Sequence, residues 1–188
     1  LNGTVGLVRS PERAIAQSAA MVPEDRKRQG LLIDLPIEDN VELADLAANG
    51  GFWLQPSRAR QLVNRMRDDL QIKAPRLWQS VSSLSGGNQQ KVVIAKWLAL
   101  DPDLLILDEP TRGIDIGTKF ELYRLIDGFA ARGKAVLLVS SELPEILALA
   151  DRVLVMRNGA IVAELPHAEA TEEAILSYAV GELAGVAN

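Results

Sequence analysis

Two short, continuously apolar runs place the strongest constraint on the fold of this chain. They are LLILD at residues 104–108 and AVLLV at residues 135–139. Uninterrupted apolar runs of this length suit strands of a parallel sheet that are covered on both faces. Between the runs, apolar residues recur at helical spacing at Leu122, Leu125, Ile126, Phe129 and Ala130. The pattern predicts a strand–helix–strand unit, and with it an α/β fold with a parallel core sheet.

The segments on either side of this unit predict further helices and a hairpin. Residues 40–79 carry apolar side chains at helical spacing, with Ser57 as a predicted N-cap. The other predicted elements are a strand pair in 1–9, a helix in 11–15, a strand in 20–22, a helix from Leu143, a hairpin with an Asn-Gly turn in 152–165, and a last helix capped by Thr171.

The composition excludes several classes of function. The 188 residues include 20 basic and 25 acidic side chains, so the net charge of -5 gives no basic surface for nucleic acid or anionic lipid. The chain has no cysteine, which excludes disulfides, thiolate catalysis and cysteine-based zinc sites. No apolar run approaches the roughly 18 residues of a membrane span.

Two carboxylates, Asp108 and Glu109, directly end the first apolar run. In open α/β sheets, ligands bind beyond the carboxyl ends of the strands. An aspartate there can hold a magnesium ion through water, and an adjacent glutamate can orient or deprotonate an attacking water. Taken alone, the pair also fits a strand followed by a polar turn.

The tripeptide Ser85-Gly86-Gly87 precedes a helix predicted over residues 88–100. A helix N-terminus of this kind can bind an anion, because its first backbone N–H groups are unpaired. The glycines would let those groups approach a phosphate, and the serine would add a hydroxyl donor. Taken alone, the tripeptide also fits an ordinary helix entry.

Together the motifs resemble those of ABC-type ATPases. LSGGNQQ, DPDLLILDEPT and GID, which ends in Asp115, resemble the signature, Walker B and D-loop motifs of that family. Their order and spacing match the family from about Leu84 to Gly159. Upstream, VPEDRKRQGLL and IEDNVELADL look like the C-terminal ATPase half of monosaccharide importers of the ribose, galactose and xylose type. The resemblance implies a partial P-loop NTPase (ABC ATPase) fold with a parallel core sheet and a helical subdomain.

The family also has a phosphate loop, G-x-x-x-x-G-K-[S/T], which is not found here. We reject the near match GFAARGKA at 128–135 for two reasons. Ala135 replaces the residue whose hydroxyl would bind magnesium. A phosphate loop follows a strand and leads into a helix, whereas here a helix is predicted to end and a strand to begin. The chain is therefore expected to be one ABC ATPase domain over residues 1–188, truncated at its N-terminus. Its expected parts are a helical and signature subdomain at about 40–100, a core sheet with Walker B at 101–165, and a helical tail at 166–188.

The resemblance assigns a role to each motif residue. Glu109 would be catalytic, Asp108 would hold Mg²⁺ through water, and ATP would be the nucleotide. The remaining assignments are nucleotide binding by Ser85, Gly86, Gly87 and Gln89, and coupling or interface contacts by Asp115, Glu24 and Ser141.

Two positions depart from the common family pattern. Glu24 stands at the usual Q-loop position, and Ser141 stands where a switch histidine usually contacts the γ-phosphate. A serine cannot carry the charge that a histidine can, although Ser141 would suit the N-terminus of the following helix. The one histidine, His167, lies near the C-terminal end and is expected to be exposed. Both departures resemble the C-terminal half of the importer subgroup.

The resemblance implies an ATP-binding, ATP-hydrolysing second half that powers sugar import. Its partners would be the other ATPase half, paired head to tail, transmembrane permease subunits and, indirectly, an extracellular sugar-binding protein. The place would be the cytoplasmic face of a bacterial-type cell membrane. The alternatives are a degenerate regulatory nucleotide-binding module and a non-transport ABC ATPase, whose long heptad runs or basic arms are not seen here.

We predict that this chain alone neither binds ATP tightly nor hydrolyses it. The physical reason is that its sequence lacks the loop and lysine that hold the β- and γ-phosphates in this family. Calorimetric titration of the chain with Mg-ATP should therefore show no micromolar binding, and micromolar binding would contradict the expectation.

Overall fold

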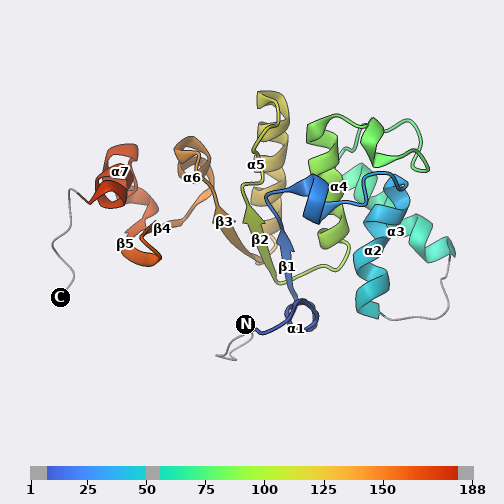
Figure 1. Ribbon diagram of the computed structural model, residues 1–188, viewed down its shortest axis with the longest axis horizontal. Helices are drawn as coiled ribbons and strands as arrows, with labels where there is room; N and C mark the ends of the chain where they lie inside the picture. Colours follow the sequence, from blue (N-terminus) through green and yellow to red (C-terminus); the bar gives the residue numbers. More distant parts are fainter. Residues whose placement is uncertain (1–7, 50–55, 182–188) are drawn as a thin grey trace. The chain divides into compact units, whose positions relative to one another are not determined.

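The computed structural model describes residues 8–49 and 56–181 (Figure 1). The described chain divides into two compact units, one ending at Val139 and one beginning at Ser140. Most of the strand pair predicted in residues 1–9 lies outside the described residues. Among the described residues, no helix is long and apolar enough to cross a membrane.

The first unit is built on a parallel three-stranded sheet in the order β1-β2-β3. The strands are β1 (Ala19–Val22), β2 (Leu104–Asp108) and β3 (Ala135–Val139). β2 lies in the middle, and its Leu105 is in register with Ala20 on one side and Val136 on the other. The predicted strand–helix–strand unit is confirmed, because α5 (Ile116–Ala130) connects β2 to β3.

Only one face of this sheet is covered by the described residues. On the covered face Leu105 and Leu107 are fully buried, with α4 (Gly86–Leu98) packed against β1 and α5 packed against β3. On the other face, Met21 and Leu137 are each 46% exposed. The predicted coverage of both strand faces is therefore not seen for β3 among the described residues, whereas Leu104 and Ile106 of β2 are partly buried. A continuously apolar run shows that a strand can be buried on both faces, but not that a covering layer is present.

The middle of the chain forms two helices that pack beside α4 (Figure 1). They are α2 (Ile37–Asn49) and α3 (Pro56–Asp69). Residues 70–79 are not helical, contrary to the prediction, because the chain pairs there with an earlier segment: the N–H of Ile37 donates to the Gln79 carbonyl at 3.1 Å. Ser57 lies inside the first turn of α3 rather than before it, so the predicted N-cap was also wrong.

Short turns connect these helices to the sheet. α1 (Pro11–Ala16) is the short helix predicted in residues 11–15, and Ser10 caps it. A π-helical turn, Arg26–Gly30, follows β1, and a 3-10 turn, Val81–Ser83, leads into α4. The near match to a phosphate loop at 128–135 lies at the end of α5 and the start of β3, with Gly133 in the left-handed region at φ 79°. That placement agrees with its rejection.

The second unit contains α6 (Leu143–Leu149), β4 (Arg152–Arg157), β5 (Ala160–Pro166), a 3-10 turn (His167–Glu169) and α7 (Glu172–Val180). β4 and β5 form the predicted antiparallel hairpin, and Asn158 and Gly159 both have positive φ, as a type I′ turn requires. Thr171 caps α7, as predicted. The core of this unit consists of Val153, Val155, Leu165 and Ile175.

We predict that truncation on the two faces of the sheet has very different costs. Leu105→Ala should lower the free energy of unfolding by about 2–5 kcal/mol, because a fully buried side chain leaves a cavity. Leu137→Ala, on the uncovered face, should cost less than about 1 kcal/mol. Urea unfolding of this chain measures both values, and equal costs would mean that the Leu137 face is also packed.

Candidate functional site

The candidate site is centred on the first turn of α4. Ser85 is the N-cap, and its Oγ accepts a hydrogen bond from the backbone N–H of Asn88 at 3.4 Å. The helix begins at Gly86, two residues before the predicted start, so both glycines belong to its first turn. Ser85 is exposed and Gly87 is buried. The turn therefore presents a hydroxyl and the unpaired N–H groups of a helix start on one side.

The glycines of this turn lie tightly against two neighbouring side chains. A Cβ added at Gly87 would stand 2.6 Å from Thr118 Cγ2, and one added at Gly86 would stand 2.8 Å from an Arg26 guanidinium nitrogen. Neither Gly86 nor Gly87 has a positive φ. At Gly87 the close approach of Thr118, not an unusual backbone conformation, explains why glycine is required; at Gly86 the neighbour is the flexible end of Arg26, which can move away.

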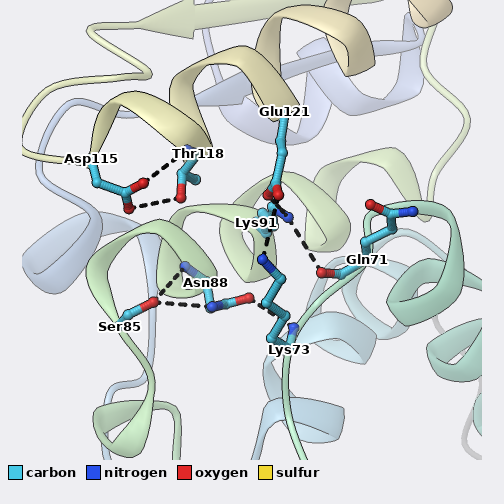
Figure 2. Close-up of polar contacts among 8 residues, drawn as sticks. All are labelled: Gln71, Lys73, Ser85, Asn88, Lys91, Asp115, Thr118 and Glu121. Atoms are coloured by element: carbon cyan, nitrogen blue, oxygen red, sulfur yellow. Dashed lines mark hydrogen bonds and ion pairs between the residues drawn. The ribbon is translucent and has the colours of Figure 1, made fainter.

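Asp115 lies on the adjacent α5 and is its N-cap (Figure 2). Its carboxylate accepts from the Thr118 backbone N–H at 3.0 Å and from the Thr118 hydroxyl at 2.8 Å. The backbone hydrogen bond, followed by the hydroxyl, lowers the pKa of Asp115. Because Thr118 also contacts Gly87, the structure brings Ser85 and Asp115, two residues predicted for the site, to neighbouring helix starts.

Glu24 joins the same region through an ion pair. Its carboxylate pairs with the Arg112 guanidinium, and the Arg26 side chain donates to the Arg112 carbonyl at 3.3 Å. Arg112 precedes the loop that leads into Asp115. The segment after β1 therefore contacts both the Arg112 loop and, through Arg26, the first turn of α4.

Asp108 and Glu109 lie at the carboxyl end of the central strand, as predicted. Asp108 is in register with Val139, and the Glu109 N–H donates to the Val139 carbonyl at 2.8 Å. Glu109 has φ 47°, a left-handed conformation that is uncommon for a residue other than glycine and that occurs at functional sites. No group of three or more metal-ligating side chains gathers among the described residues. Two carboxylates alone still suit Mg²⁺, which keeps several waters and binds proteins through one or two carboxylates plus phosphate.

Two other predicted site residues are Gln89, which is on α4, and Ser141, which is in the other unit. Gln89 is buried, and its side-chain amide donates to the carbonyls of Leu84 at 3.1 Å and Val81 at 3.4 Å, so it supports the turn before α4. Ser141 belongs to the second unit. The cap of α6 is Glu142, and its N–H donates to the hydroxyl of Ser140 rather than Ser141, which corrects the predicted capping role.

The sequence reasoning missed a polar network behind the site (Figure 2). Lys91 on α4 has a side chain that is 3% exposed, and its Nζ lies 2.6 Å from the Glu121 carboxylate on α5. Lys73 pairs with the other oxygen of Glu121 at 3.4 Å. The hydrogen bond from Lys91 is the main cause that lowers the pKa of Glu121. The available signal was a lysine inside the apolar pattern of α4, where a charge needs a partner.

Comparison with known proteins identifies relatives of the chain. The family model described as "ABC transporter" matches residues 4–112. The chain is 51% identical to a ribose import ATP-binding protein of Streptomyces avermitilis over 93% of the chain and 35% of that protein. It is 46% identical to a xylose import ATP-binding protein of Moorella thermoacetica over 96% of the chain and 36% of that protein. The chain thus spans about a third of the length of these curated relatives.

A solved structure shares the fold. It is the dimeric post-hydrolysis state of the ATP-binding cassette MJ0796 bound to ADP and Pi, with a TM-score of 0.72 and 21% identity. The match covers 85% of this chain and 68% of that one. The α/β architecture with a parallel sheet and a helical subdomain, predicted from the sequence motifs, is confirmed.

We predict that Gly87→Ala destabilises the first unit, because the added methyl group would overlap Thr118. The free energy of unfolding should fall by about 1 kcal/mol or more. Gly128→Ala is the matched control, since a Cβ there meets nothing within 4 Å in the interior of α5. The control should gain about 0.5–1 kcal/mol. Equal shifts in urea unfolding would contradict the contact with Thr118.

Proposed function

This chain belongs to the ABC transporter family, and from that premise we propose that it is the ATP-binding and ATP-hydrolysing part of a monosaccharide importer. The names of its relatives, import proteins for ribose and xylose, support the substrate class. The observation that carries the proposal is the exposed Ser85 at the start of α4, with Asp115, the N-cap of α5, beside it. This placement of both motifs supports a nucleotide-binding interface at the two helix starts.

The first turn of α4 would bind the γ-phosphate of ATP held by a second ATPase half. Backbone N–H groups at a helix start carry partial positive charge, so a phosphate is attracted to them. The Ser85 hydroxyl would add a donor. Gly86 and Gly87, which have no side chains, would let the backbone N–H groups approach the phosphate. Gln89 would act indirectly, since its amide binds the carbonyls of Leu84 and Val81.

The carboxylates of β2 would serve a different phosphate group, because they lie at the strand end rather than at α4. Asp108 would hold Mg²⁺ through water, and the ion, when bound, neutralises charge on the phosphates. Glu109 would orient or deprotonate the attacking water. Its backbone conformation is held by the hydrogen bond to Val139.

Asp115 and Glu24 would couple this site to the partners. Asp115 would lie at the interface between ATPase halves, and the Glu24 segment with α2 and α3 would contact the permease subunits. Opening and closing of the ATPase pair would then drive those subunits, and the protein would work at the cytoplasmic face of the membrane. The Glu24–Arg112 pair supports this, because it connects the segment after β1 to the loop before Asp115.

We further propose that the productive ATP site is the one completed by Ser85, not the one that uses Glu109. The motivation is the presence of Glu24 and Ser141 at positions where the family usually has a glutamine and a histidine. Ser141, in particular, cannot supply the charge of a histidine beside the phosphate.

We predict that Ser85→Arg in the intact protein reduces sugar uptake by about a hundredfold or more, because it removes a donor to the developing charge and fills the site. Glu109→Gln should reduce uptake much less than the roughly hundredfold loss of a general base at a productive site. Uptake of labelled ribose by cells measures both effects. Ala168→Arg, at an exposed position in the second unit, is the control and should leave uptake unchanged. Equal losses for Ser85→Arg and Glu109→Gln would contradict the asymmetry.

A further inference from the structure

Asn88 contacts Ser85 in a way that an ordinary helix cap does not. Its Nδ2 donates to Ser85 Oγ at 3.0 Å, in addition to the backbone N–H bond to the same oxygen. In the usual capping box, the side chain at this position accepts from the backbone N–H of the cap residue. Here it donates to the cap hydroxyl instead, so its effect falls directly on that hydroxyl.

The backbone of a distant segment fixes the orientation of the Asn88 amide. The Lys73 N–H donates to Asn88 Oδ1 at 2.8 Å. If the amide were turned over, its NH₂ group would oppose the Lys73 donor, and the hydrogen-bonding pattern therefore assigns the nitrogen to the Ser85 side. Figure 2 shows Asn88 between Ser85 and Lys73.

This arrangement determines what the Ser85 hydroxyl can do. A serine oxygen has two acceptor lone pairs and one O–H donor. Two N–H groups of Asn88 approach the oxygen, so its accepting capacity is used inside the turn. The proton is left to donate outward, on an exposed side chain. A donor without a competing acceptor is the group that a phosphate oxygen requires.

The Lys73 segment is itself tied to both helices of the site. Lys91 donates to the Gln71 carbonyl at 3.3 Å, and both lysines pair with Glu121 on α5. A nearly buried lysine that holds a neighbouring carbonyl and carboxylate leaves the segment little freedom to move. The position of the Lys73 N–H, and with it the Asn88 amide, is therefore set by the contact between α4 and α5.

We infer that Asn88 is a positioning residue that makes the Ser85 hydroxyl a dedicated phosphate donor. The inference rests on the proposed function, because it gives that hydroxyl a phosphate to bind. It adds a residue whose side chain does not itself contact ATP and which acts through Ser85.

A double-mutant cycle in the intact protein tests the inference, with ATPase kcat as the readout. Asn88→Ala should lower kcat about tenfold, the size of one lost hydrogen bond of this kind. In the Ser85→Ala background, where no hydroxyl remains to be oriented, Asn88→Ala should change kcat by less than about twofold. The same tenfold loss in both backgrounds would overturn the inference, since Asn88 would then act on the helix alone.

A second variant separates orientation from folding. Asn88→Asp keeps the size of the side chain and favours a helix N-terminus, so the thermal midpoint should not fall. Its carboxylate would accept from the Ser85 hydroxyl and take away the outward donor, so kcat should fall at least as far as in Asn88→Ala. Wild-type kcat in Asn88→Asp would overturn the inference. Asn158→Asp, the same change in the exposed turn between β4 and β5, is the control and should leave kcat unchanged.

The Ser85→Ala variant distinguishes the two levels of the argument. A Ser85→Ala protein with wild-type kcat and KM would remove the proposed role of the signature turn, and the inference with it. An impaired Ser85→Ala protein combined with additive effects of Asn88→Ala would leave the proposed function standing and reject only the positioning role.

Discussion

The ion pair between Lys91 and Glu121 is the contact on which the geometry of the candidate site depends. It joins α4, which begins at Ser85, to α5, which begins at Asp115. A lysine that is almost fully buried is stable only with a close partner, because an unpaired charge in that position is strongly destabilising. The pair therefore fixes which turns of the two helices face each other. Thr118 lies against Gly87 as a consequence of that alignment.

The segment after β1 forms a second connection around the same turns. Arg26 lies over Gly86, Glu24 pairs with Arg112, and the ammonium group of Lys96 on α4 donates to the Gly30 carbonyl. Burial lowers the pKa of Lys96, since a charge there has lost much of its hydration. Lys96 thus holds the turn against α4, and the Glu24–Arg112 pair holds the segment after β1 against the loop that leads into α5. A movement of either helix start would disturb these contacts as well.

Much of the fold could be predicted from local signals. The apolar runs of β2 and β3, the cap Thr171, and the Asn-Gly turn each depend on a few adjacent residues, and each was found where expected. The errors have a different origin. Residues 70–79 have helical spacing, but they pair with the chain around Ile37, and a contact between distant segments leaves no periodic signal. The open face of β3 was missed for the same reason, because burial depends on what else is present.

The candidate site shows the same division. Its motif residues follow from spacing along the chain, whereas the side-chain directions do not. Gln89 stands in the motif and turns inward to two carbonyls, while Asn88, its neighbour, turns toward Ser85. Adjacent residues on a helix point about 100° apart, so a motif fixes which residues are near the ligand but not which of them face it.

Packing within the domain, independent of any ligand, also favours glycine in this motif. The sequence suggested that the glycines let backbone N–H groups approach a phosphate. In the structure, the space beside Gly87 is already taken by Thr118, whereas beside Gly86 lies only the flexible end of Arg26. The small residue at Gly87 lets α5 come close to the first turn of α4. The same close approach puts the Asp115 cap near Ser85, so one steric requirement determines both the packing of the helices and the arrangement of the candidate site.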